Sequence, residues 1–164
     1  MKFFFIPLLL LGLPAINHSK EINMNTQQKE AVHRLYEECL NKRNFGSLKD
    51  IFGDEYTGPG GEKGPAGFEQ IIRPLIAAFP DIQWKVEDIL QEGDKVAVRH
   101  SWKGTNTGVF RGIAATNKPF TDSGLGIFQF KDGKIVAAWI LTDRLGFVQQ
   151  LGVVPTTIFP PQPK

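Results

Sequence analysis

Asp143 is the residue whose type and position most directly suggest chemistry. The stretch 134–152 has the pattern of a β-strand that runs into a short helix, with Asp143 at the junction. Alternate residues of a strand share one face, so Trp139 and Asp143 would lie on the same side. A carboxylate against such an apolar wall has a raised pKa and can act as a general base. An Asp before a helix is also typical of an N-cap, and spacing alone leaves both interpretations open.

Other chemistries have little support in the sequence. Beyond residue 20 the histidines are His33 and His100, which do not have metal-ligand spacing. The single cysteine, Cys39, excludes an internal disulfide and lies in a helical pattern typical of a core residue. The glycine-rich segment 58–64 lacks the Gly-Lys-Ser/Thr ending of a phosphate-binding loop. We therefore expect no metal site and no phosphate-binding loop.

Length and charge limit the class of protein. The chain has 164 residues, of which 41% are hydrophobic and 22% charged, as expected for one globular domain with a single core. Without residues 1–20 it has 17 basic and 17 acidic side chains. A neutral chain with no extensive basic patch is not typical of nucleic-acid binding, so we expect no nucleic-acid partner.

The two ends differ in composition from the middle. Residues 1–20 contain a basic start, a short apolar run and a small residue, Ala15, which together predict a secretory signal peptide. The run is too short for a membrane span, so we expect no stable membrane anchor and a secreted or periplasmic protein. If translation starts at Met24, the protein would instead be cytoplasmic. Residues 155–164 are rich in proline and predict a frayed tail.

The middle, 21–154, changes its hydrophobic period once. Helical spacing predicts a helix from residue 25 or 26 to about 42, a short one over 47–52, and a third from Pro65 to Pro80. An irregular segment at 54–64 precedes this third helix. After the helix, the spacing of apolar residues changes to the two-residue period of strands. Four long antiparallel strands follow, joined by turns, and a short helix ends the domain. The predicted strands are 82–91, 95–107, 118–131 and the one beginning at 134.

The resulting fold class is α+β, a strongly curved antiparallel sheet wrapped around the N-terminal helices. One face of a long sheet must be buried, and the preceding apolar helices are the available cover. Val96, Val98 and Trp102 share a strand face with His100, opposite Arg99, so they lie either in the core or on the outer sheet face. An apolar outer face favours pairing of two copies, so we expect a homodimer.

The chain resembles the SnoaL-like polyketide cyclases, also called ester cyclases, over about residues 26–154. The resemblance rests on short motifs that occur in the family's order. They are Phe79-Pro80-Asp81, Val86-Glu87-Asp88, Gly93-Asp94-Lys95-Val96, Gly104-Thr105-Asn106-Thr107-Gly108, Gly112-Ile113, Ile127-Phe128-Gln129-Phe130, Asp132-Gly133-Lys134-Ile135, Trp139, Asp143 and Leu151-Gly152. It implies the cone of the nuclear-transport-factor-2-like superfamily and cofactor-free closure of a polyketide ring by an intramolecular aldol reaction.

The resemblance also implies roles for particular residues. Asp143 matches the family's acid/base aspartate, and Asn106 stands where members commonly have a histidine, so it is a candidate for orienting a substrate oxygen. The predicted substrate-binding residues are Trp139, Arg99, Phe128 and Phe79. Two functions follow: an enzyme that cyclises a small hydrophobic carbonyl compound, or an exported protein that binds a small apolar ligand without chemistry. The missing family histidines and the export signal favour the second; Trp139 and Asp143 favour the first.

Overall fold

The computed structural model describes residues 18–154, with side chains from residue 24 onward. The predicted signal peptide lies outside this range apart from residues 18–20, and the predicted tail lies wholly outside it. The helical segments are α1 (His18–Arg34), η1 (Leu35–Asn41), η2 (Phe45–Ser47), α2 (Leu48–Ile51), α3 (Gly64–Ala78) and α4 (Arg144–Gln150). The strands are β1 (Phe52–Thr57), β2 (Gln83–Glu92), β3 (Lys95–Thr105), β4 (Pro119–Lys131) and β5 (Lys134–Thr142). No helix within 18–154 is long and apolar enough to cross a membrane.

One sheet with the strand order β1-β5-β4-β3-β2 forms the frame of the molecule. The four strands β2 to β5 are antiparallel neighbours in chain order, which confirms the predicted meander. The fifth strand, β1, pairs in parallel with β5 and had been predicted as helix end and irregular segment. Its two buried aromatic residues, Phe52 and Tyr56, hold it against Phe68 of α3.

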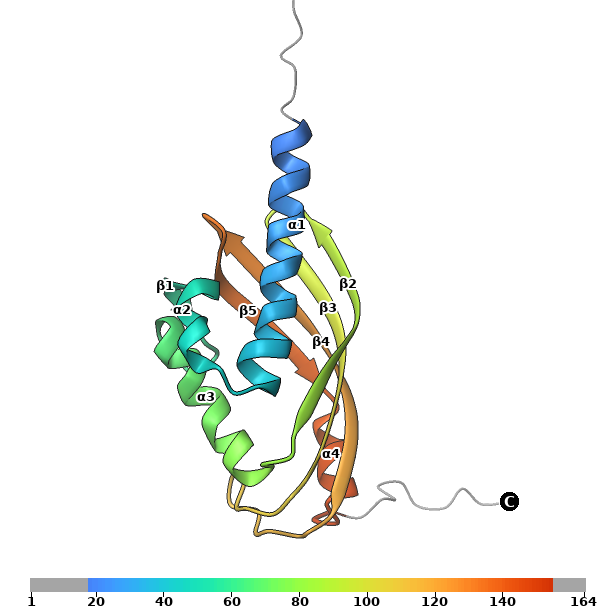
Figure 1. Ribbon diagram of the computed structural model, residues 1–164. Helices are drawn as coiled ribbons and strands as arrows, with labels where there is room; N and C mark the ends of the chain where they lie inside the picture. The colour runs from blue at the N-terminus through green and yellow to red at the C-terminus, as the bar shows by residue number, and fades with distance from the viewer. Residues whose placement is uncertain (1–17, 155–164) are drawn as a thin grey trace, which may run out of the picture.

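The helices cover the concave face of this sheet, which confirms the α+β prediction. In Figure 1, α1 lies in front of the curved strands, α2 and α3 lie to their left, and α4 lies at the opposite end from the start of α1. The last turns of the first helix, η1, widen to π-helical geometry and pack on β2. Pro65 lies in the first turn of α3, where a missing N–H costs nothing, and the helix continues through Pro74.

The inner face of β3 follows the predicted alternation. Val96, Val98, His100 and Trp102 are all buried on the concave side, so the first of the two alternatives for these residues holds. On β4 the inward positions facing them are Phe120, Asp122, Gly124, Gly126 and Phe128.

Strand β5 does not keep the predicted alternation, because it contains a β-bulge. Ile135 pairs with Phe130, and Ala137 pairs with Gln129, which leaves Val136 as an extra residue. An extra residue shifts every later side chain to the other face. Ile135 therefore points inward, and the inward positions after the bulge are Ala138, Ile140 and Thr142, which line an internal cavity.

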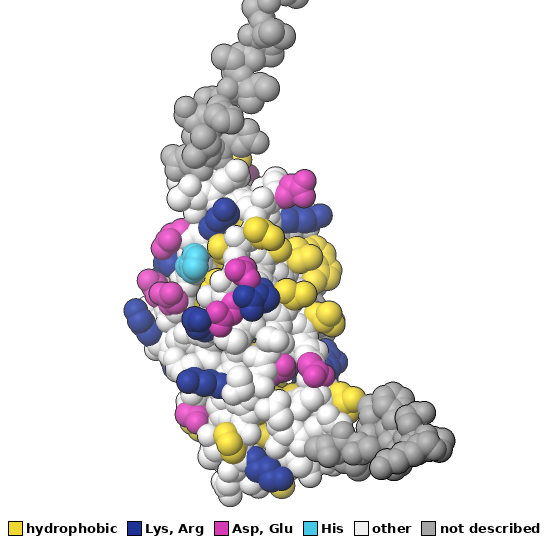
Figure 2. Space-filling model, turned by 90° about the vertical axis from the view of Figure 1, so that its right-hand side faces the viewer, with side chains coloured by type: hydrophobic (Ala, Val, Ile, Leu, Met, Phe, Trp, Pro, Cys, Tyr) yellow, Lys and Arg dark blue, Asp and Glu magenta, His cyan; other side chains and the backbone are white. Residues whose placement is uncertain are grey.

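The outer face of the sheet carries a row of apolar residues. Leu90, Ala97, Ile127 and Trp139 lie side by side across four strands, and a second row pairs Leu125 with Leu141. The five large side chains of these rows are between 43% and 72% exposed. Hydrophobic side chains gather toward the right-hand edge of Figure 2, on this side of the molecule. We call these two rows the outer apolar patch.

Gly124 makes room for the imidazole of His100 on the inner face. A Cβ atom at position 124 would lie 2.7 Å from His100 Nε2 and 3.0 Å from the carbonyl oxygen of Leu141. We expect Gly124→Ala to lower the free energy of unfolding by about 1–3 kcal/mol, the usual cost of overpacking. Urea denaturation measures this change.

The matched control is Gly53→Ala on β1. A Cβ atom at position 53 would meet Lys134 and Val136 side-chain atoms at 3.5 Å, an ordinary contact. We expect this variant to be at least as stable as the wild type, because alanine loses less backbone entropy than glycine. Equal destabilisation by both variants would contradict the placement of the His100 ring over Gly124.

Candidate active site

An apolar cavity of about 410 Å³ lies between the concave face of the sheet and the helices α3 and α4. Its apolar walls come from one face of α3, from β5 after the bulge, from the segment 110–113 and from α4. Apolar cavities with a few convergent polar groups are the usual form of a small-molecule site. The polar side chains that line this one include Tyr56, His100, Arg111, Thr142, Arg144 and the indoles of Trp84 and Trp102.

His100 lies at the inner surface of the cavity and is only 4% exposed. Its Nδ1 lies 3.2 Å from the hydroxyl oxygen of Tyr36, which comes from η1. Burial lowers the pKa of His100 to about 4, and burial also raises the pKa of Tyr36 well above its usual range. Both groups are therefore neutral at physiological pH.

Asp122 and Trp102 form a second polar group on the same face. They lie directly opposite each other on β4 and β3. The Asp122 Oδ2 atom and the Trp102 Nε1 atom are both buried without a hydrogen-bond partner within residues 18–154. The Trp102 indole lies near enough to the Asp122 carboxylate to favour its charged form slightly, which lowers the pKa of Asp122. The two groups nevertheless lack hydrogen-bond geometry. Trp102 lines the cavity, whereas Asp122, its neighbour across the strands, does not line it directly.

The pKa of Asp122 is raised. Burial is the largest cause, and the negative charge of nearby Asp143 adds to it, while a hydrogen bond from the Ser123 N–H opposes it. A carboxyl group with a raised pKa and an unpaired oxygen is a typical candidate for proton transfer.

Asp143 has the geometry of a helix N-cap. Its side chain is exposed, and its Oδ1 accepts a hydrogen bond of 2.9 Å from the Gly146 N–H in the first turn of α4. It is not among the residues that line the cavity. Of the two interpretations of this residue, the structure therefore shows the cap, and the acid/base role stays a prediction.

Trp139 and Arg99 do not lie where the sequence placed them. The bulge at Val136 turns Trp139 to the outer face, where it is 53% exposed, so it forms no wall beside Asp143 inside the cavity. Arg99 also lies on the outer face, where its guanidinium donates to Asp88 at 2.6 Å. Neither side chain reaches the cavity.

Phe79, Phe128 and Asn106 are buried but lie outside the lining of the cavity. Phe79 packs beneath it, with its ring centroid 5.6 Å from those of Phe110 and Phe147, which do line it. Asn106 braces its own loop: its amide donates to the Gly108 carbonyl and accepts from the Thr116 N–H, both at 2.8 Å. That amide is therefore not directed at a substrate oxygen.

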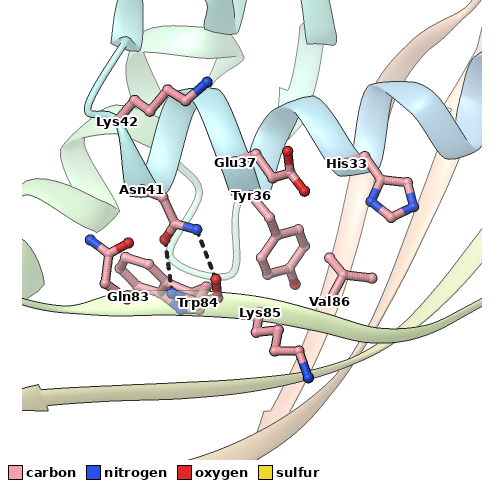
Figure 3. A pocket seen from close by; sticks show the side chains of 9 residues that line it. All are labelled: His33, Tyr36, Glu37, Asn41, Lys42, Gln83, Trp84, Lys85 and Val86. Carbon is pink, nitrogen blue, oxygen red and sulfur yellow. Dashed lines mark hydrogen bonds between the residues drawn. The ribbon is translucent and has the colours of Figure 1, made fainter.

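A second cavity of about 500 Å³ lies between η1 and β2 (Figure 3). Its rim carries charged side chains, including Glu37, Lys42 and Lys85. At one end, the Asn41 side chain makes two hydrogen bonds with the backbone of Trp84, at 2.7 and 2.8 Å. This lining mixes charged with apolar side chains and, within the described chain, includes no buried side-chain polar atom without a hydrogen-bond partner. We therefore regard the inner cavity as the candidate active site.

Comparison with known families gives one match. Residues 30–151 match the family described as SnoaL-like polyketide cyclase. The chain belongs to this family. No curated protein matches the chain.

Solved structures support the membership. TsrD from Streptomyces laurentii is 28% identical with a TM-score of 0.69, over 80% of this chain and 97% of that one. IdmH from Streptomyces antibioticus is 29% identical with a TM-score of 0.67, over 77% of this chain and 99% of that one. A SnoaL-like polyketide cyclase from Agrobacterium tumefaciens, at 20% identity and a TM-score of 0.67, covers 76% of this chain and 98% of its own. Because this third structure is only 20% identical, it supports the fold alone.

Sequence reasoning missed the residues that the structure brings together. The strand pattern places His100 on the face opposite Arg99, but it carries no signal that distinguishes a functional histidine from an ordinary strand histidine. Asp122 was not singled out, although it alternates with Phe120 and Phe128 on the inner face of β4. Tracing the inward positions of β3 onto β4 would have placed Asp122 beside Trp102.

The cap can be tested with two substitutions at one position. Asn caps a helix about as well as Asp, so Asp143→Asn should leave the free energy of unfolding nearly unchanged, whereas Asp143→Ala should lower it by about 1 kcal/mol. Thermal or urea denaturation at neutral pH measures both. A variant pair with equal stabilities would show that the bond to Gly146 contributes nothing.

Proposed function

We propose that this protein closes a ring in a small hydrophobic carbonyl compound by a cofactor-free intramolecular aldol reaction inside the inner cavity. The observation that carries the proposal is the buried, unpaired carboxylate oxygen of Asp122 beside an apolar cavity. The polyketide cyclase family supports the reaction class.

In the proposed reaction, a carboxylate removes a proton from a carbon next to a carbonyl, and the electron pair moves onto the carbonyl oxygen. The enolate carbon then attacks a second carbonyl of the same molecule, which forms a C–C bond and an alkoxide. The protonated carboxyl returns its proton to the alkoxide. The reaction needs no redox partner, and a substrate that fills the apolar cavity displaces water from the reacting atoms.

We assign the proton transfer to Asp122. Its raised pKa brings the carboxylate closer to working pH, where proton transfer is most efficient. In this proposal the indole of Trp102 moves aside when the substrate binds and exposes the carboxylate. Asp143 contributes its negative charge, which helps to raise the pKa of Asp122. The family's aspartate would then act through its neighbour.

The assignment predicts different results for three Asp→Asn variants. Asp122→Asn should lower the rate of ring closure by about 10²- to 10⁴-fold, the usual loss for a general base. Asp143→Asn keeps the cap but removes a charge, so it should shift the acidic limb of the pH–rate profile downward with a smaller loss. Asp132→Asn in the β4–β5 turn is the control and should leave the rate unchanged. Mass spectrometry of aromatic poly-carbonyl substrates and their cyclised products measures these rates.

The same variants have a signature in stability. A raised folded-state pKa means that ionising Asp122 costs folding free energy, a cost that grows as pH rises from the unfolded value of about 4 through the folded pKa. Asp122→Asn should therefore be more stable than the wild type at pH 7 and similar to it near pH 3.5. Full activity of Asp122→Asn together with inactive Asp143→Asn would transfer the role to Asp143.

A non-catalytic binding protein is the second candidate, because Asp122 does not itself line the cavity. It would hold a small apolar ligand in the same space. Tight binding of a ligand that co-purifies with the protein, without conversion by the wild type, would favour this function.

We also propose that the outer apolar patch pairs two copies of the chain. Large exposed apolar patches on a soluble protein usually mark an interface. The bulge in β5 adds Trp139 and Leu141 to this patch, and the Arg99–Asp88 ion pair lies at its edge. A patch on the convex face of the sheet can pair with itself about a two-fold axis.

Replacing one residue of the patch should therefore change the mass of the particle. At micromolar concentration the wild type should scatter light as a dimer, and Leu141→Lys should scatter as a monomer because it places a charge in the interface. Val109→Lys is the matched control, since Val109 is 71% exposed and Leu141 is 72% exposed. A monomeric wild type would exclude the patch as a dimer interface.

A further inference from the structure

His100 is one of several polar side chains of the inner cavity that the proposed proton transfer does not use. His100 projects from β3 over Gly124, and the missing side chain at position 124 leaves space for its Nε2–Cε1 edge. Within residues 18–154, the only hydrogen bond of its ring is that of Nδ1 with Tyr36. The His100 ring lines the cavity, and its Nε2 atom therefore has no hydrogen-bond partner there within the described residues.

Tyr36 determines which nitrogen of His100 carries the proton. The phenol is 3% exposed, and His100 Nδ1 is the only hydrogen-bond acceptor near its hydroxyl hydrogen in the described part of the chain. If Nδ1 carried the proton, the hydroxyl hydrogen would be buried without an acceptor, which is costly. The phenol therefore donates to Nδ1, and the neutral ring carries its proton on Nε2.

The donor stays neutral over the working range of pH. Burial lowers the pKa of His100 to about 4, so the ring does not gain a second proton, and Tyr36 does not ionise. A neutral imidazole N–H can hydrogen-bond a developing oxyanion without giving up its proton.

We propose that His100 Nε2–H is the donor that stabilises the enolate oxygen formed in the cavity, with Tyr36 as the residue that positions it. This inference rests on the proposed function and adds the oxyanion partner to it. When the carboxylate removes the C–H proton, negative charge collects on the carbonyl oxygen, and the hydrogen bond from Nε2 strengthens. No proton leaves His100, and the bond weakens again once the enolate carbon has attacked.

An unreactive pair of ligands tests this donor without turnover. 4-Nitrophenolate is a planar aromatic oxyanion, and nitrobenzene has the same ring without that oxygen. At pH 8 the wild type should bind 4-nitrophenolate more tightly than nitrobenzene. The change in visible absorption of 4-nitrophenolate measures its binding, and displacement of 4-nitrophenolate by nitrobenzene measures that of the second ligand. His100→Leu should weaken the binding of 4-nitrophenolate about tenfold and that of nitrobenzene less than twofold.

Two further variants separate the hydrogen bond from packing. His100→Gln retains an amide N–H donor and should recover most of the preference for 4-nitrophenolate. If His100 served only to pack the cavity wall, this substitution would not restore the preference. Tyr36→Phe should lose part of the preference, because the tautomer is no longer fixed. His33→Gln, at the second cavity, is the control and should bind both ligands as the wild type does.

The tautomer can be observed directly. A ¹⁵N–¹H correlation spectrum of the imidazole should show His100 protonated on Nε2 alone between pH 5.5 and pH 8. Protonation on Nδ1 would overturn the inference, as would equal binding of the two ligands by the wild type or equal losses for both ligands in His100→Leu. Because neither ligand reacts, these results do not depend on whether ring closure is found.

Discussion

The β-bulge at Val136 is the local constraint on which the arrangement of the site depends. One extra residue in β5 inverts the alternation of the strand between Ile135 and Ala138. The inversion directs Ala138, Ile140 and Thr142 into the cone, where they leave a cavity instead of a filled core. It directs Trp139 and Leu141 outward, where they extend the outer apolar patch. The cavity and the patch therefore have one cause.

Inside the cone, the structure retains polar groups whose burial costs stability. The Asp122 Oδ2 and Trp102 Nε1 atoms have no partners in the described chain, and each unpaired buried group costs about 1–3 kcal/mol. The Tyr36–His100 pair, in contrast, is joined by a hydrogen bond. Unsatisfied groups of this kind concentrate at functional sites, where a substrate supplies the missing partner. The position of the unpaired groups beside the apolar cavity supports the assignment of the active site.

The sequence predicted the order of the helices and of the four meander strands, the curved sheet, and which residues of β3 share a face. It left open whether that face of β3 is the inner or the outer one. It missed β1, whose Phe-Gly-Asp-Glu-Tyr-Thr sequence contains glycine and two acids and gains its order by pairing with β5. It also misplaced Trp139, because a bulge leaves no signal in the spacing of apolar residues. Asp143 had two valid interpretations, and only the hydrogen bond to Gly146 distinguished the cap. Pairing across strands, which brings Asp122 to Trp102, is not contained in any local pattern.

The ionisation of Asp122 tests the account most directly, since the proposed chemistry depends on a carboxyl group held in an apolar site. A ¹³C NMR titration of the side-chain carboxyl groups, with Asp122→Asn to assign the signal, measures its pKa. The account predicts a pKa above the ordinary value of about 4 that moves downward in Asp143→Asn. A pKa at or below the ordinary value, unchanged by Asp143→Asn, would contradict the assignment of this carboxylate as the acid/base group.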